Sequence, residues 1–214
     1  MWHRLLTCAT PLLILNEALI VNQQKNDPDH LATFTEPGAA LDYLGGKFFG
    51  PQLIAEARVV SPAEVPEPFK SLLVHNNHMT TSLEAFHGAP VRLEVIEQRL
   101  DGEIYQRKIL LTIAPNRVVE VGVVRILLQL VPPAAREEIL KQERPLGDIL
   151  IRHDVLRSIE PRWFFRFDGP PALLSAFDRP LEGPVYGRVG IIHCNGEPAI
   201  ELLEVISGKT EPRP

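Results

Sequence analysis

The chain has 214 residues, 45% of them hydrophobic and 23% charged, which are the proportions of a soluble globular protein. Its formal net charge of −5 at pH 7 argues against a general affinity for nucleic acid or for an anionic membrane. The two cysteines, Cys8 and Cys194, form neither a disulfide framework nor a paired metal motif, so we expect a reducing, cytoplasmic location.

The N-terminal segment is the least regular part of the sequence. Its first residues imitate a signal peptide, but Pro11 interrupts the apolar run and no small-residue cleavage site follows before Gln23. No apolar stretch approaches the ~20 residues that a membrane-spanning helix needs. We expect a helix over 5–21 that breaks at Pro11. The predicted organisation is an N-terminal extension packed on the core (residues 1–60), one domain (61–208) and a disordered tail (209–214).

The middle of the chain alternates short helices and strands. PFKSLLVH at 68–75 predicts a short helix, and in HMTTSLEAFHG at 78–88 Thr81 and Glu84 have the spacing of a capping box. Gly88 stands where a helix ends in a left-handed residue. Beyond it, alternating apolar and polar residues predict three strands, over 91–100, 104–113 and 117–128.

The second half of the chain predicts two more helices and three more strands. Prolines open a helix at 131–142, and RPLGDILIRH predicts another at 144–153. RWFFRF is strand-like at 162–167, and Asn195-Gly196 joins two apolar runs, 185–194 and 198–206, into a hairpin. Six strands with helices between the hairpins predict a single α+β domain, with an antiparallel sheet of about six strands and short helices as flaps over one face.

Arg107 is the first candidate for a functional residue. Strand alternation places it on one face with Tyr105, Ile109 and Leu111, so its guanidinium shares that face with expected core residues. A buried guanidinium is costly unless it is paired, and its planar fork suits a carboxylate. The alternative is an arginine at the sheet edge that extends to water.

Two acidic residues of the last strand are candidates for its partner. Glu201 and Glu204 are three positions apart, so they point to opposite faces and at most one of them faces the core. An inward carboxylate next to an arginine is either a structural ion pair or a pair that handles a substrate.

The histidine and cysteine spacings disfavour metal and thiol chemistry. His75 and His78 have a spacing that suits a shared metal on a helix. A third ligand at a diagnostic spacing is missing, so we expect a capping or surface role for them and no metal site. Cys194 is expected to be a small core residue rather than a nucleophile.

Five segments together resemble the chorismate lyase superfamily, which also contains the effector-binding domains of some bacterial repressors. They occur in the family's order over residues 70–206: LLVHNNHMTTSLEAFHG, YQRKILL, VGVV, RPLGDIL and GEPAIELLEV. The resemblance implies a chorismate lyase-like fold for residues 61–208. It also implies an enzyme that needs no cofactor, because aromatisation of the ring drives the reaction, and positioning and electrostatics suffice.

Carried over residue by residue, the resemblance implies catalytic roles for Arg107, which would grip the ring carboxylate, and for Glu204, which would assist proton movement. Glu201 is the fallback for Glu204. Three further substrate-binding residues are implied: Met79, Gly122 and Leu146. The implied activity is cleavage of chorismate to 4-hydroxybenzoate and pyruvate, and the implied partner is a small aromatic-precursor carboxylate.

Two alternatives remain open at this point. One is an enzyme of the same fold that acts on another substrate, because a fold does not determine a function. The other is a non-catalytic small-molecule-binding domain of the repressor effector type. DNA binding by the chain itself is disfavoured, since residues 1–60 contain no basic recognition helix and few basic residues, namely Arg4, Lys25, Lys47 and Arg58.

Overall fold

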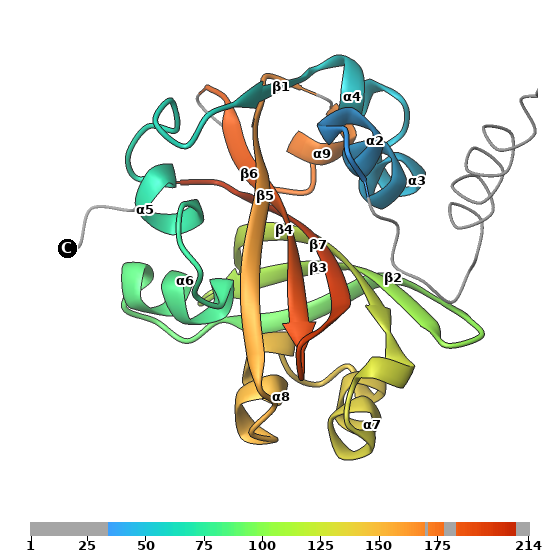
Figure 1. Ribbon diagram of the computed structural model, residues 1–214. Coiled ribbons are helices and arrows are strands. Elements are labelled where there is room, and N and C mark those ends of the chain that lie inside the picture. Colours follow the sequence, from blue (N-terminus) through green and yellow to red (C-terminus); the bar gives the residue numbers. More distant parts are fainter. Residues whose placement is uncertain (1–33, 170, 178–182, 209–214) are drawn as a thin grey trace, which may run out of the picture.

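The computed structural model describes residues 34–169, 171–177 and 183–208 (Figure 1). The predicted helix over 5–21 and the predicted tail at 209–214 lie outside these residues. The helical elements are α2 (Pro37–Leu41), η1 (Asp42–Gly46), α3 (Lys47–Phe49), α4 (Gln52–Ala55), α5 (Phe69–Leu73), α6 (Met79–His87), η2 (Leu128–Leu130), α7 (Pro133–Lys141), α8 (Leu146–Arg152) and α9 (Pro171–Leu174). The strands are β1 (Ala57–Val60), β2 (Arg92–Asp101), β3 (Ile104–Ile113), β4 (Arg117–Leu127), β5 (Arg157–Phe167), β6 (Val185–Cys194) and β7 (Glu197–Ile206).

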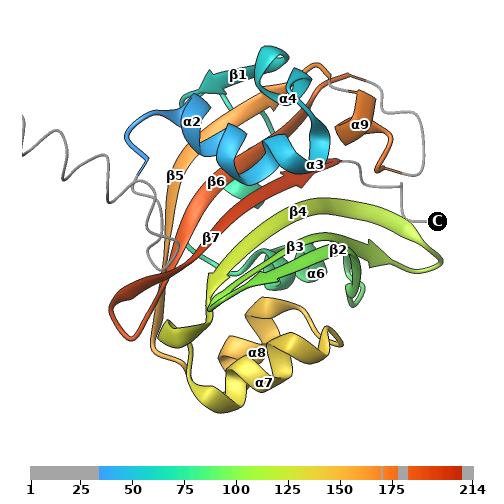
Figure 2. The ribbon, with the colours of Figure 1, turned by 90° about the vertical axis from the view of Figure 1, so that its right-hand side faces the viewer.

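The strands form one antiparallel sheet in the order β1-β5-β6-β7-β4-β3-β2. Figure 2 shows that this sheet is strongly curved. The α+β class and the antiparallel sheet are confirmed, but the sheet has seven strands rather than about six. The additional strand, β1, spans four residues and pairs with the end of β5, and so short a run carries too little alternation to predict a strand.

Helices cover both faces of the sheet, whereas the sequence predicted flaps over one. On one face, α6 and α8 pack against alternate residues of β3 such as Tyr105 and Ile109. On the other face, α2, η1 and α3 pack against Val121, Val123 and Leu203. The helices on the second face, α2, η1 and α3, span residues 37–49, for which the sequence predicted no helix. Because both faces are buried, β4 and β7 consist almost entirely of buried residues.

The helix ends explain how the covering helices are placed. Gly88 ends α6 with φ 66°, in the predicted left-handed conformation. The predicted capping box is wrong, because α6 begins at Met79, before Thr81. The Glu84 carboxylate instead accepts a hydrogen bond from the backbone amide of Val91, at 3.1 Å. Glu84 therefore ties the end of α6 to the start of β2. Every helix in the described part of the chain is too short or too polar to cross a membrane.

Candidate functional site

A small cavity of about 40 Å³ lies between the sheet and helices α6 and α8. Its lining includes Met79 at the start of α6 and Leu146 at the start of α8. The sheet contributes Glu120 and Val124 from β4 and Glu204 from β7. Three of the residues expected to bind a substrate, Met79, Leu146 and Glu204, therefore meet at this cavity.

Gly122, another expected site residue, forms part of the sheet beneath the cavity. It pairs with Ile109 of β3 on one side and with Glu204 of β7 on the other. A Cβ atom added at Gly122 would lie 2.9 Å from Cγ1 of Ile109 and 3.1 Å from Oε1 of Glu120. The absence of a side chain at position 122 therefore leaves room for Ile109 and Glu120.

Arg107 lies on the same face of the sheet and is fully buried. Arg107 pairs with Val124 of β4, and the next residue of β3 on that face is Ile109. Val124 and Ile109 both line the cavity. None of the three guanidinium nitrogens of Arg107 has a hydrogen-bond partner among the described residues. Burial lowers the pKa of Arg107, and the nearby phenol of Tyr105 partly offsets this effect. The burial predicted by strand alternation is confirmed, and the alternative of an arginine extended to water is wrong.

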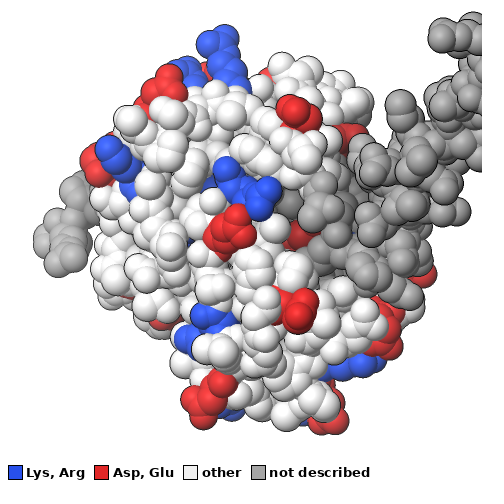
Figure 3. All heavy atoms as spheres, in the orientation of Figure 1, with Lys and Arg blue, Asp and Glu red and all other residues white. Residues whose placement is uncertain are grey.

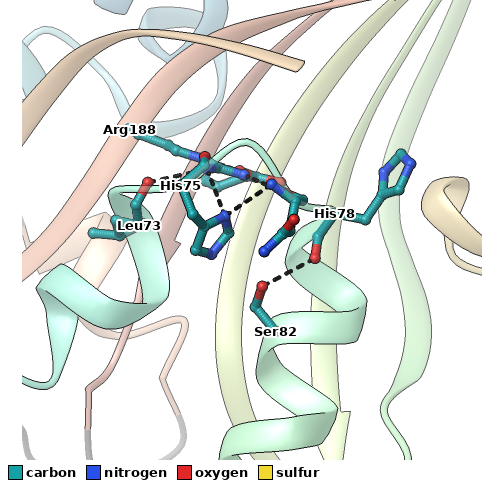
Figure 4. Close-up of polar contacts among 7 residues, drawn as sticks. Leu73, His75, His78, Ser82 and Arg188 are labelled. Atoms are coloured by element: carbon teal, nitrogen blue, oxygen red, sulfur yellow. Dashed lines mark hydrogen bonds and ion pairs between the residues drawn. The ribbon is translucent and has the colours of Figure 1, made fainter. Parts of the chain in front are cut away.

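Glu204, the expected partner of Arg107, is paired with a different arginine. Its Oε2 accepts a hydrogen bond of 2.6 Å from Nε of Arg188 on β6. Arg188 is 1% exposed. Its Nη1 also donates to the backbone carbonyls of Leu73 (3.0 Å) and His75 (2.7 Å) (Figure 4). Its Nη2 donates to that of Asn77 (3.3 Å).

Sequence reasoning missed Arg188, although a signal was present. Position 188 lies within an apolar strand and alternates with Tyr186 and Ile192 on the cavity face, which is the pattern that identified Arg107. Glu120 was missed for the same kind of reason. Its segment, RVVEVGVV, predicts a β-branched strand, and its one carboxylate lies at a position of that strand that faces the cavity.

Glu120 is an unusual carboxyl group for the inside of a protein. It is 2% exposed, and its Oε2 has no hydrogen-bond partner among the described residues. Burial raises the pKa of Glu120 well above its ordinary value, and the neighbouring carboxylate of Glu204 raises it further, against the opposing effect of Arg188. The surroundings of Glu120 therefore disfavour its charged form, whereas the guanidinium of Arg188 is hydrogen-bonded to Glu204.

Glu201 lies on the opposite face of the sheet, as strand alternation predicted. Its Oε2 is 3.1 Å from Nη1 of Arg125, and both side chains are almost completely buried. Since helices α2, η1 and α3 cover that face, Glu201 does not reach the cavity. The fallback assignment of a site carboxylate to Glu201 has no support in this geometry.

His78 separates the cavity from an open groove of about 620 Å³, because it lines both. Its Nε2 accepts a hydrogen bond of 2.6 Å from Nε of Arg157, which requires a neutral imidazole. Burial, followed by the positive charges of Arg157 and Arg188, lowers the pKa of His78 to about 4. Its backbone carbonyl accepts a hydrogen bond from the Ser82 hydroxyl (Figure 4), so His78 sits firmly at the start of α6.

The other histidine and cysteine candidates have structural surroundings. His75 Nδ1 accepts a hydrogen bond from the backbone amide of Asn77, at 3.1 Å. Within the described residues, no group of three or more histidine, cysteine or acidic side chains is arranged to hold a metal ion. Cys194 is buried, and burial raises the pKa of its thiol to about 11. This agrees with the prediction of a core residue, because the thiolate form is suppressed.

No protein-family model matches the sequence, and no curated protein is similar to it. Solved structures do match. PhnF from Mycobacterium smegmatis is 11% identical, with a TM-score of 0.48, over 62% of this chain and 64% of that one. The effector domain of the same PhnF is 11% identical, with a TM-score of 0.45, over 62% of this chain and 89% of that one. A GntR-family transcriptional regulator from Bacillus cereus is 8% identical, with a TM-score of 0.40, over 58% of this chain and 96% of that one. The chain thus spans less than two thirds of the PhnF chain.

The prediction of a chorismate-cleaving enzyme is wrong. The matching structures reported above are described as an effector domain and a transcriptional regulator, not as lyases. The geometry agrees with this correction. The Glu204 carboxylate, expected to move a proton beside Arg107, is instead held at 2.6 Å by Arg188.

Proposed function

We propose that the chain is a non-catalytic binding domain for a small anionic molecule, which occupies the cavity under α6 and α8 with its anionic group on Arg107. The observation that carries this proposal is the buried guanidinium whose three nitrogens lack partners among the described residues. The residues assigned to the site are Arg107, Met79, Gly122, Leu146 and Glu204, with the role of Glu204 changed from catalysis to lining the cavity through its pair with Arg188.

An unpaired buried arginine is costly for a protein that gains nothing from it. Removing an ion from water costs several kcal/mol, and without an opposite charge or an acceptor beside it nothing offsets that cost. A carboxylate that enters beside Arg107 would supply the missing acceptors in bidentate form. The surrounding residues Ile109, Leu111 and Val124 are apolar and line the cavity, so the rest of the ligand is expected to be apolar, such as a ring.

The ligand requires a wider site than the structure contains. A cavity needs at least ~10–15 Å³ of free volume to hold one water molecule. The cavity of about 40 Å³ therefore accommodates only a few waters. We therefore expect α6 and α8, which carry Met79 and Leu146, to separate when a ligand binds. The groove outside His78 is the expected side of entry.

Isothermal titration calorimetry with benzoate and with benzamide tests the proposal. The carboxylate should bind and the neutral amide should not, and the carboxylate should be recovered unchanged. Arg107→Met should weaken binding at least ~30-fold, equivalent to about 2 kcal/mol, because it removes one partner of a buried charge pair. The same variant should unfold at a higher temperature than the wild type without ligand, since an unpaired buried charge is replaced by an apolar chain.

Lys108→Met is the matched control. Lys108 is the next residue of β3 but lies on the opposite face, with its Nζ 4.5 Å from the centre of the Phe49 ring. This variant removes the same charge from the same strand and should leave benzoate affinity unchanged. Equal loss of affinity in both variants would show a nonspecific charge effect, and equal affinity for benzoate and benzamide would refute the role of Arg107.

A further inference from the structure

We infer that Glu120 is the second polar contact for the ligand, and that it donates a hydrogen bond from a neutral carboxyl group to an uncharged oxygen of that ligand. The inference rests on the proposed function and narrows it to one ligand class. That class is a small monoanion with an anionic group at one end and a neutral oxygen acceptor at the other.

The position of Glu120 gives the first argument. It lies opposite Leu111 of β3 and Ile206 of β7, on the same face as Arg107. Its side chain lines the cavity, yet its Oε2 has no hydrogen-bond partner among the described residues. A buried polar atom without a partner destabilises the folded protein, so such an atom at a binding cavity is a group that a ligand would satisfy.

The charges around Glu120 give the second argument. Two carboxyl groups, Glu120 and Glu204, line the cavity, and the positive charge that acts on Glu120 is that of Arg188. The Nε of Arg188 lies 2.6 Å from Oε2 of Glu204, and its Nη1 and Nη2 donate to three backbone carbonyls. Glu120 is thus left without a cation, and a buried carboxyl beside another carboxylate retains its proton. A protonated carboxyl has one O–H donor, which a neutral ligand oxygen satisfies.

The separation of the two contacts limits the ligand's size. Arg107 stands opposite Val124, and Glu120 is four residues before Val124 in β4, a distance of roughly 13 Å between backbones. The two long side chains span part of that distance, and a single ring with polar groups at opposite ends spans the remainder. A second negative charge at the Glu120 end would be repelled by Glu204.

Three benzoates that differ only at the 4-position test this inference. In the wild type, 4-hydroxybenzoate should bind about tenfold more tightly than 4-methylbenzoate, since the two have similar shape and only the first has an oxygen for Glu120. Terephthalate, with a second carboxylate there, should bind more weakly than either. Glu120→Gln keeps a neutral donor and should preserve the preference, whereas Glu120→Met should bind the hydroxyl and methyl compounds equally.

The outcomes separate the inference from the proposed function. If the compounds bind through Arg107 but Glu120→Met keeps the tenfold preference, or the wild type has none, Glu120 is not a contact and the proposed function stands. If none of the three compounds binds the wild type, both are overturned for this ligand class. Should Glu120→Met fail to fold, the ranking of the three compounds by the wild type still decides the inference.

Discussion

Two arginines on one face of the sheet differ in the use of their hydrogen-bond donors. Arg188 donates to Glu204 and to backbone carbonyls, whereas Arg107 has no acceptor among the described residues. Both are almost completely buried. A guanidinium whose three nitrogens all donate inside the protein stabilises its neighbours, and one without acceptors is available to a ligand. This contrast, and not burial alone, separates a structural arginine from a candidate binding residue.

Gly122→Ala tests the packing beneath the cavity. The new methyl group would lie 2.9 Å from Cγ1 of Ile109, and overpacking of this kind costs about 1–3 kcal/mol. Alanine is favoured over glycine in a strand by roughly 0.5–1 kcal/mol, so a net loss of stability is expected. Urea unfolding measures it, and benzoate affinity should fall as well because Ile109 moves into the cavity.

Gly38→Ala is the control for that variant. A Cβ atom at Gly38 would meet nothing within 4 Å, and Gly38 lies in helix α2 on the far face. This variant should be as stable as the wild type or more so, because alanine favours the helix. A Gly122→Ala protein as stable as the Gly38→Ala protein would show that Ile109 adjusts without cost.

At the scale of single residues, the sequence predicted orientation but not partnership. Alternation within one strand placed Arg107 inward and put Glu201 and Glu204 on opposite faces, and the structure confirms both. The partner of Glu204 depends on which residue of β6 lies opposite it, and Arg188 does. Strand register arises from the packing of the whole sheet, so the pair between Glu204 and Arg188 was not predictable from either strand alone.

Arg188 connects the sheet to the segment between α5 and α6. Its contacts with the carbonyls of Leu73, His75 and Asn77 hold the chain that leads into the first turn of α6. Arg188→Met should cost about 3–5 kcal/mol, because it leaves Glu204 as an unpaired buried charge. Hydrogen exchange should show faster exchange of the amides at 74–79.

A second substitution distinguishes the loss of charge from the loss of those contacts. Arg188→Met combined with Glu204→Gln removes the unpaired charge but does not restore the donors to the three carbonyls. This double variant should recover part of the stability, while the amides at 74–79 still exchange fast. Full protection of that segment in the double variant would mean that Arg188 does not anchor it.

At the scale of elements, regular patterns were predicted well and short or context-dependent ones were not. The hairpin of β2 and β3 and that of β6 and β7 follow from alternation and turn residues. The Thr81 and Glu84 spacing predicted a helix start that the structure does not have, since Glu84 bonds to Val91 instead. A glutamate at this position can accept a hydrogen bond either from the helix's own first turn, as in a capping box, or from the next strand. Tertiary packing decides which amide it binds.

For the whole molecule, the buried site and the surface have different electrostatics. Acidic and basic side chains are interspersed over the face seen in Figure 3, and the net charge is −5. A mixed surface with a negative net charge gives little long-range attraction for an anion. Selectivity for an anionic ligand would therefore come from the buried guanidinium of Arg107 and from its apolar surroundings.

The fold class followed from the sequence, but the activity did not. Hydrophobic alternation determines which faces of strands are buried, and that pattern was sufficient for an antiparallel α+β domain. The activity depends on which polar side chains remain unpaired at the cavity, and the expected pair of Arg107 and Glu204 was replaced by that of Arg188 and Glu204. Folds are compatible with many functions because such site residues vary independently of the core pattern.

The stability of the whole protein should depend on pH through His78. Its pKa is about 4 in the folded protein, against an ordinary value of 6.5, so the unfolded chain binds a proton first as the pH falls. The contribution of neutral His78 to the free energy of unfolding is fully present above pH 6.5. It is lost as the pH falls from 6.5 to 4, because protonation then favours the unfolded chain. Because the side chain is partly exposed, we expect a loss of roughly 1–2 kcal/mol rather than the full value of the shift.

His78→Gln isolates this contribution, because glutamine can accept the hydrogen bond from Arg157 but does not titrate. The difference in unfolding free energy between the wild type and the variant should be constant above pH 7. It should shift in favour of the variant between pH 6.5 and pH 4. His87, whose pKa burial and Arg117 also lower to about 4, remains in both proteins and cancels from the difference. Parallel stability curves over this range would mean that His78 accepts a proton as readily in the folded protein as in the unfolded chain.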